Sequence, residues 1–113
     1  DADTLHQAID YVAADRQRLA KDLGITEPMD YALAYEHRNL LDVAEMIAET
    51  AMLRTESRGP HYRRDFPERD DANWMTNLFV TRTGDGPSIR KHWINEETGW
   101  TDDPEDIRIS PWG

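Results

Sequence analysis

The sequence contains no cysteine, and this absence excludes several kinds of function. Disulfide bonds, thiolate zinc sites and cysteine-ligated iron–sulfur clusters all need cysteine side chains. Basic residues are also in the minority, because 13 lysines and arginines stand against 23 aspartates and glutamates, for a net charge of −10. A nucleic-acid backbone binds a basic surface, so we predict no nucleic-acid partner.

Long apolar runs and catalytic sequence motifs are missing as well. No apolar segment approaches the roughly 20 residues of a transmembrane helix, and none resembles a signal peptide, so we predict no direct membrane insertion. Ser57 lies outside any G-x-S-x-G pattern, and Gly84-Asp85-Gly86 lacks the third glycine and following helix of a phosphate-binding loop. The four histidines are scattered, which disfavours a metal site. We therefore assign no catalytic, cofactor-binding or metal-binding residue.

A strong helical pattern is present. The 113 residues fit one small domain, and a first residue of Asp1 rather than Met predicts a piece of a longer chain. From Thr4 to Leu23, apolar residues recur with the 3.6-residue period of an amphipathic helix. Thr4 and Gln7 fit a capping box, and Gly24 fits the left-handed position after the helix. Arg16 interrupts the apolar stripe, and we expect its head to reach water.

A second, longer helix is predicted to begin at Glu27–Pro28, with Thr26 as its N-cap, and to end at Gly59-Pro60. At about thirty residues it would be about 45 Å long. The short loop between the two helices predicts an antiparallel helical hairpin. Since the second helix has apolar residues on more than one side, another element must cover it. A homodimer that pairs two hairpins into a four-helix bundle would do so.

Residues 60–113 have a different character. An irregular charged segment comes first, and the tail, residues 95–113, is expected to wrap over a surface with its tryptophans as anchors. The remaining predicted elements are a helical turn at Asn73–Asn77 and a small β-hairpin formed by Leu78–Arg82 and Ser88–Ile94. The prediction is a mainly α chain, with a helical hairpin in residues 1–59 and the irregular, hairpin-containing part in residues 60–113.

The most informative segment is the charged motif, residues 54–74, which reads RTESRGPHYRRDFPERDDANW. It packs five arginines, five carboxylates and a histidine around Gly59-Pro60. The residues that define its pattern are Glu56, Ser57, Arg58, Gly59, His61, Arg63, Asp65, Arg69, Asp70, Asp71 and Trp74.

This motif resembles the C-terminal domain of the succinate dehydrogenase/fumarate reductase flavoprotein subunit family, whose wider group includes L-aspartate oxidases and adenylylsulfate reductases. The resemblance covers about Leu33 to Arg82 and implies that the helical hairpin is part of a spectrin-repeat-like three-helix bundle. Pro60 stands where the family often has a small residue, and Met75-Thr76-Asn77 replaces its usual lysine and histidine. These departures leave the parent reaction open among the members of the wider group.

The resemblance also implies a parent enzyme that binds FAD and interconverts succinate and fumarate, or oxidises a related substrate. The family's catalytic and flavin-linking residues lie upstream of this region, so these 113 residues alone are expected to bind no FAD and to be inactive. The expected partners are the FAD-binding domain of the same parent chain and an iron–sulfur subunit. The expected location is cytoplasmic, at the membrane face through partner subunits.

Two roles are open for the charged motif. Its arginines could clamp a dicarboxylate, as in a sensor or binding site. Alternatively, they pair with neighbouring acids and hold the irregular segment against the helices and an adjacent domain. We favour this second role, a domain-docking motif, because every arginine has an acid within a few positions. We expect His61 to be a structural histidine with satisfied hydrogen bonds. A standalone module that dimerises through its exposed helix face is the alternative to an enzyme piece.

Overall fold

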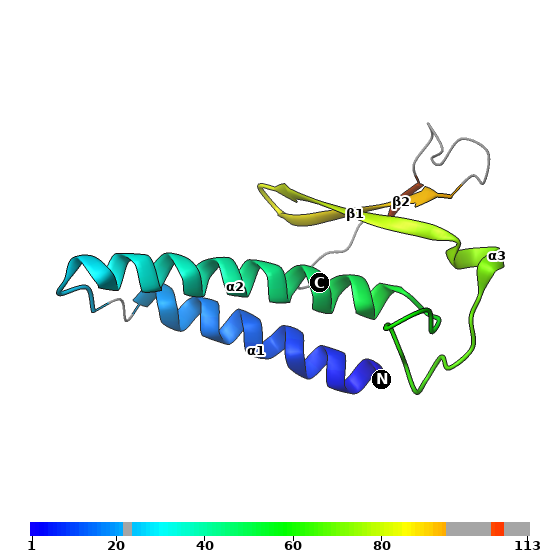
Figure 1. Ribbon diagram of the computed structural model, residues 1–113, viewed down its shortest axis with the longest axis horizontal. Helices are drawn as coiled ribbons and strands as arrows, with labels where there is room; N and C mark the ends of the chain where they lie inside the picture. Colours follow the sequence, from blue (N-terminus) through cyan, green and yellow to red (C-terminus); the bar gives the residue numbers. More distant parts are fainter. Residues whose placement is uncertain (22–23, 95–104, 108–113) are drawn as a thin grey trace.

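The computed structural model describes residues 1–21, 24–94 and 105–107. Helices α1 (Ala2–Lys21) and α2 (Pro28–Leu53) form the predicted antiparallel hairpin, and the short α3 (Asp71–Trp74) follows the charged motif. Strands β1 (Thr76–Thr83), β2 (Gly86–Trp93) and β3 (Glu105–Ile107) complete the order of elements. In Figure 1, α2 lies between α1 and the β1–β2 hairpin, so the long helix is the centre of the molecule.

Helix α1 begins earlier than predicted because Asp1 caps it. The Thr4 backbone N–H donates to Asp1 Oδ1 at 3.1 Å, so the predicted capping box on Thr4 and Gln7 is wrong. Ile9 and Val12 are the buried residues of this helix. Among the described residues, positive φ angles occur only at Gly59 and Gly86, so the predicted left-handed Gly24 is also wrong.

Helix α2 begins as predicted but ends earlier. Its N-cap is Glu27, whose backbone N–H donates to Asp30 Oδ2 at 2.8 Å, and Thr26 donates to the same oxygen instead of serving as the cap. The predicted end at Gly59-Pro60 is wrong, because Arg54 already has an extended conformation (φ −71°, ψ 104°). The side-chain contacts that stop the helix there belong to the charged motif.

The small sheet has the strand order β1-β2-β3, and both strand pairs are antiparallel. The predicted hairpin is confirmed, with Val80 opposite the fully buried Ile89 and with Gly86 (φ 110°) as the first residue of β2 after the turn. The predicted helical turn lies slightly earlier, as α3, since Thr76 already belongs to β1. Most of the predicted tail, including Trp100 and Trp112, lies outside the described residues, although 105–107 form β3.

The core is small and divided between the hairpin of helices and the sheet. The buried apolar residues of the described chain are Ile9, Val12, Leu41, Ala48, Trp74 and Ile89. Only two long helices occur among the described residues, so the third helix of the expected bundle is not found in them. No helix within these residues is long and apolar enough to cross a membrane.

Candidate functional site: the charged motif

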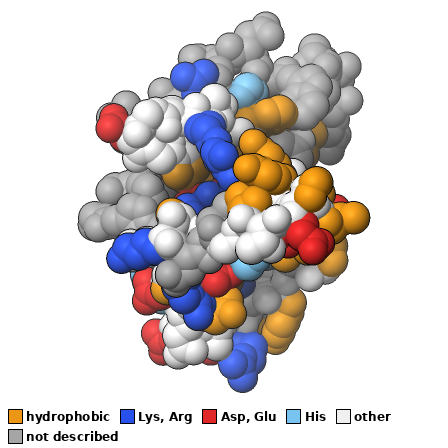
Figure 2. Space-filling model, turned by 90° about the vertical axis from the view of Figure 1, so that its left-hand side faces the viewer, with side chains coloured by type: hydrophobic (Ala, Val, Ile, Leu, Met, Phe, Trp, Pro, Cys, Tyr) orange, Lys and Arg blue, Asp and Glu red, His pale blue; other side chains and the backbone are white. Residues whose placement is uncertain are grey.

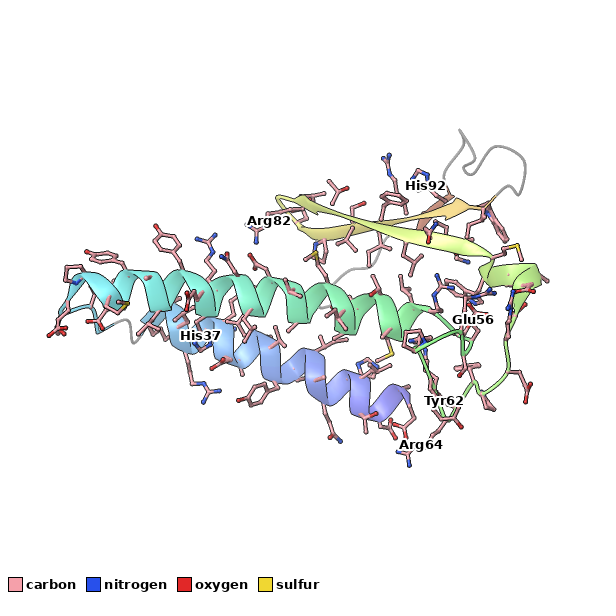
Figure 3. The ribbon with its side chains drawn as sticks, viewed as in Figure 1. His37, Glu56, Tyr62, Arg64, Arg82 and His92 are labelled. Atoms are coloured by element: carbon pink, nitrogen blue, oxygen red, sulfur yellow. The ribbon has the colours of Figure 1, made fainter. Side chains whose placement is uncertain are left out.

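Glu56 lies at the centre of the charged motif and its side chain is fully buried. Its carboxylate accepts hydrogen bonds from Arg54 Nη1 (2.7 Å), Arg58 Nε (2.8 Å) and the Asp70 backbone N–H (2.7 Å). Burial alone would raise the pKa of Glu56, but the hydrogen bonds from Arg58, the Asp70 N–H and Arg54 outweigh it and lower this pKa to about 2. Figure 3 shows Glu56 between the end of α2 and α3, so this carboxylate joins the two elements.

Arg63 is the second buried charge, at 3% exposure, and it closes the end of α2. Its Nη1 donates to the carbonyl oxygens of Met52 (2.7 Å), Arg54 (3.1 Å) and Ala51 (3.3 Å). A cation at the negative end of a helix dipole is favourable, and these carbonyls have no partner within the helix. This cap explains why α2 ends at Leu53.

Asp65 connects the end of α2 to the start of α1. Its carboxylate pairs with Arg63 Nη2 at 2.6 Å, and its Oδ2 accepts a hydrogen bond from the Ala2 backbone N–H at 3.0 Å. The hydrogen bond from Arg63 is the main reason that the pKa of Asp65 is lowered to about 2. The motif therefore fastens both helices at the same end of the hairpin.

The other end of the motif connects to the sheet. Arg54 donates to the carbonyl oxygens of Trp74 (3.0 Å) and Thr76 (2.8 Å), and Trp74 Nε1 donates to Thr55 Oγ1 (2.9 Å). Lys91 of β2 places its Nζ 3.7 Å from the centre of the Trp74 ring. These contacts hold α3 and the start of β1 against the last turn of α2.

A tight turn at Gly59-Pro60 connects the two halves of the motif. The backbone groups of Arg58 and His61 bond to each other, and Gly59 has φ 55°, which favours glycine. Ser57 Oγ accepts from the Arg63 N–H at 2.9 Å and donates to the Phe66 carbonyl at 2.8 Å. His61 differs from the expectation, because its buried Nε2 has no hydrogen-bond partner among the described residues.

All five arginines of the motif are ion-paired within this chain. Arg69 and Arg58 share Asp71, and Arg64 pairs with Asp1 at 3.1 Å. The remaining two, Arg54 and Arg63, pair with the carboxylates described above. A dicarboxylate would have to break these pairs to bind, so the geometry favours the ion-pair lattice over a sensor or a binding site.

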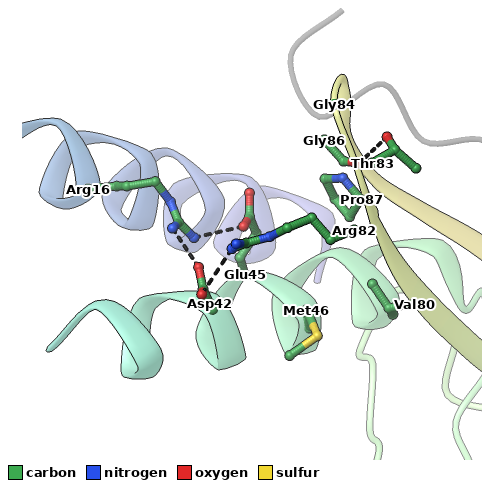
Figure 4. A pocket seen from close by; sticks show the side chains of 10 residues that line it. All are labelled: Arg16, Asp42, Glu45, Met46, Val80, Arg82, Thr83, Gly84, Gly86 and Pro87. Carbon is green, nitrogen blue, oxygen red and sulfur yellow. Dashed lines mark hydrogen bonds and ion pairs between the residues drawn. The ribbon is translucent and has the colours of Figure 1, made fainter. Parts of the chain in front are cut away.

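A second charge cluster, not predicted from the sequence, connects the tip of the β-hairpin to the helices. Arg16 pairs with Asp42 (2.6 Å) and Glu45 (2.8 Å), and Arg82 of β1 pairs with Asp42 (3.0 Å). These side chains line an open cavity of about 420 Å³ beside Val80 (Figure 4). The Arg16 side chain is 33% exposed, and two acids of α2 bind its head, a pairing that the sequence did not predict. The position of Arg16 inside the apolar stripe of α1 is the sequence signal that could have indicated an acidic partner on the neighbouring helix.

Within residues 1–21, 24–94 and 105–107, no three histidine or acidic side chains gather as a metal site would require. The charges of both clusters are used in holding elements together. This arrangement is typical of a domain whose elements are held together by ion pairs.

Comparison with known proteins identifies the domain more closely. Residues 1–109 match the family model described as the fumarate reductase flavoprotein C-terminus, so the chain belongs to this family of C-terminal flavoprotein domains. A fumarate reductase flavoprotein subunit of Mycobacterium tuberculosis is 36% identical over 90 residues, which is 76% of this chain and 15% of that protein. The succinate dehydrogenase flavoprotein subunit of Coxiella burnetii is 49% identical over 51 residues, 45% of this chain and 9% of that protein.

The fumarate reductase flavoprotein subunit of Helicobacter pylori is similar over a shorter stretch. It is 50% identical over 48 residues, which is 42% of this chain and 7% of that protein. The chain therefore spans only a small fraction of the length of the curated relatives that it matches. These findings confirm the predicted resemblance. They fit a domain of a succinate dehydrogenase/fumarate reductase flavoprotein subunit, and they do not support an aspartate oxidase, an adenylylsulfate reductase or a standalone module.

Proposed function

We propose that this domain stabilises an FAD-dependent subunit that interconverts succinate and fumarate, and that it docks against the FAD-binding domain of the same parent chain. The observation that supports this role most directly is the charged motif, whose five arginines are all paired internally. Because these ion pairs fix the motif internally, it can present a constant surface to the FAD-binding domain. In this proposal FAD and the reacting groups lie outside these residues, an iron–sulfur subunit accepts or supplies the electrons, and partner subunits hold the assembly at the cytoplasmic face of the membrane.

The docking surface in this proposal is the outer side of the charged motif. Tyr62 and Arg64 are 67% and 71% exposed there, and they project from the turn near the start of α1 (Figure 3). Phe66 is 40% exposed on the same segment, and Arg63 lies over its ring at 4.8 Å. An aromatic side chain and a cation on a rigid turn are typical of residues that anchor an interface.

The family resemblance supports a second feature of the proposal, a third helix from the parent chain. This helix would pack beside α1 and α2 and complete the three-helix bundle. The exposed apolar side chains of α2 support it, since Leu40 is 71% exposed and Ile47 is 63% exposed. Such side chains are costly to leave in water.

Two measurements test the docking role. In the full-length subunit that contains this domain, Tyr62→Ser should lower the amount of FAD retained after purification and the fumarate-dependent oxidation of a reduced dye. Tyr11→Ser is the matched control, because Tyr11 is 65% exposed on α1 and far from the motif in sequence. Equal effects of the two substitutions would contradict docking through the motif. The 113-residue chain alone should show no flavin absorbance and no dye oxidation, and either signal would overturn the assignment of the chemistry to the rest of the subunit.

A further inference from the structure

The tip of the β1–β2 hairpin contains a chemically reactive step in the backbone. It is the peptide bond between Asp85 and Gly86, the only place in the sequence where an acidic residue precedes glycine. An aspartate carboxyl can react with the backbone nitrogen of the next residue, and a glycine there has no Cβ to hinder the approach. Whether the reaction is open to this aspartate depends on how the fold holds it.

The Asp85 carboxylate is free to react. Asp85 is exposed in the two-residue turn Gly84-Asp85, and its carboxylate has no hydrogen bond or ion pair with any residue that the structure describes. A Cβ placed on Gly84 would meet nothing within 4 Å, so the turn has open space beside it. The turn points to the left in Figure 1, and Figure 2 views the molecule from that side, where hydrophobic side chains gather on one flank of the face.

Two other aspartates precede an alanine, and the fold holds both of them. The carboxylate of Asp71 is shared by Arg58 and Arg69. The carboxylate of Asp1 accepts a hydrogen bond from the Thr4 backbone N–H at 3.1 Å. These hydrogen bonds would have to break before either carboxyl could react. The aspartate of the hairpin turn has no such protection among the described residues.

The fold also requires the glycine that makes this step reactive. Gly86 has φ 110°, a conformation that residues with a Cβ rarely adopt. It pairs with Thr83 across the two strands, and Thr83 Oγ1 donates to the Gly86 carbonyl oxygen at 2.6 Å (Figure 4). A larger residue at position 86 would hinder the reaction but strain the hairpin. The reactive step is therefore part of the turn itself.

We propose that Asp85 is a site of spontaneous covalent modification, in which succinimide formation and hydrolysis convert it to isoaspartate. In the first step the Gly86 nitrogen bonds to the side-chain carboxyl carbon, and the carboxyl OH leaves with the amide proton as water. In the second step a water molecule opens the ring. Opening at the main-chain carbonyl gives isoaspartate, and opening at the side-chain carbonyl restores aspartate. The two steps together consume no reagent, because the water that is lost returns.

Isoaspartate at this position releases the tip of the hairpin from the helices. It adds one carbon atom to the backbone of a two-residue turn, and the length of the turn fixes the register of a hairpin. Arg82, one residue before the pair that closes the turn, bonds to Asp42 of α2 at 3.0 Å. Gly84 and Gly86 line the cavity of about 420 Å³ beside this ion pair. A loss of register loosens the ion pair and opens the cavity.

Ageing of the full-length subunit at neutral pH, followed by peptide mapping with mass spectrometry, tests the modification. The peptide that contains Asp85 should separate into two peaks of equal mass, aspartate and isoaspartate, with a succinimide form lighter by one water. Asp85→Glu is the matched control, because its longer side chain has to close a larger ring that forms more slowly, and it should give one peak. The peptide that contains Asp71 should also stay single.

Limited trypsin digestion of the same samples tests the release of the hairpin tip. Cleavage after Arg82 should be several-fold faster in the aged subunit than in the fresh one. Ageing of the Asp85→Glu variant should not change this rate. Asp42→Asn, which removes the carboxylate partner of Arg82, should give the faster cleavage without ageing.

Each outcome decides a separate claim, and none of the readouts involves FAD, so the proposed function is tested independently. A single Asp85 peak in the aged native subunit would overturn the modification, and two peaks after ageing in urea would then trace the protection to the fold. Two peaks without faster cleavage after Arg82 would confirm the modification and overturn the release of the tip. Faster cleavage in aged Asp85→Glu would place the change at another site and also overturn the release.

Discussion

Replacing Glu56 by glutamine tests the physical reasoning about the charged motif most directly. The change keeps the shape of the side chain but removes the negative charge that two guanidinium groups and a backbone N–H share. The pKa of Glu56 falls from 4.5 to about 2 in the folded protein. A shift of that size corresponds to about 3 kcal/mol of stability at neutral pH, consistent with the 3–5 kcal/mol that breaking a buried ion pair costs.

The pH dependence of this effect has a definite sign. Because the folded-state pKa lies below the unfolded value, the contribution of Glu56 is fully present above about pH 4.5 and is lost as the pH falls toward 2. Urea unfolding, followed by far-ultraviolet circular dichroism, should show Glu56→Gln less stable than the unsubstituted chain by about 3 kcal/mol at pH 7. The difference should be smaller at pH 3.

The matched control is Glu68→Gln, an exposed acid of the same motif whose carboxylate has no partner among the described residues. It should change the free energy of unfolding by no more than about 0.5 kcal/mol at either pH. If Glu56→Gln behaves like this control at pH 7, or if its effect is the same at both pH values, the account of a charge-stabilised motif is wrong.

Three further substitutions test separate parts of the structure by the same unfolding assay. Gly59→Ala should cost about 1–2 kcal/mol because φ is 55° there, whereas Gly84→Ala, with open space and no positive φ, should be nearly neutral. Arg63→Met should cost about 3–5 kcal/mol, since it removes a buried cation from the end of α2, and exposed Arg64→Met should cost under about 1 kcal/mol. Glu49→Gln should raise stability at pH 7 and have less effect at pH 4, because burial first and then Glu45 raise the pKa of Glu49. A loss of stability at pH 7 in this variant would contradict the assignment.

The regular elements could be predicted because their signals are local. The apolar period of 3.6 residues predicts both helices, and β-forming residues on either side of Gly84-Asp85-Gly86 predict the hairpin. The end of α2 could not be predicted in the same way, because no local signal marks it. Leu53 and Arg54 suit a helix as well as the residues before them. The helix stops where Arg63 bonds to the carbonyl oxygens of Ala51 and Met52 in its last turn. Such a cap depends on the folded path of the intervening turn.

The sequence predicts which residues belong to the charged motif, but it does not predict which distant residues they bind. The alternation of arginines and acids correctly indicates mutual pairing, and the structure brings the motif together around Glu56. The long-range partners are not visible in the sequence, since Arg64 pairs with Asp1 and Asp65 binds the Ala2 N–H, both 63 residues away. The sequence suggests a solvated head for Arg16 for the same reason, because its partners lie on the other helix.

The two buried glutamates among the residues whose burial is described show why composition cannot assign such roles. Glu49 and Glu56 are 3% and 0% exposed, and both lie close to the end of α2. Burial raises the pKa of each, but only Glu56 has Arg54, Arg58 and a backbone N–H directed at its carboxylate. The first glutamate therefore opposes folding at neutral pH and the second favours it, although the sequence presents them only seven positions apart. What separates them is the reversal of the chain at Gly59-Pro60, which returns Asp70 to Glu56 and leaves Glu49 facing α1 and Glu45.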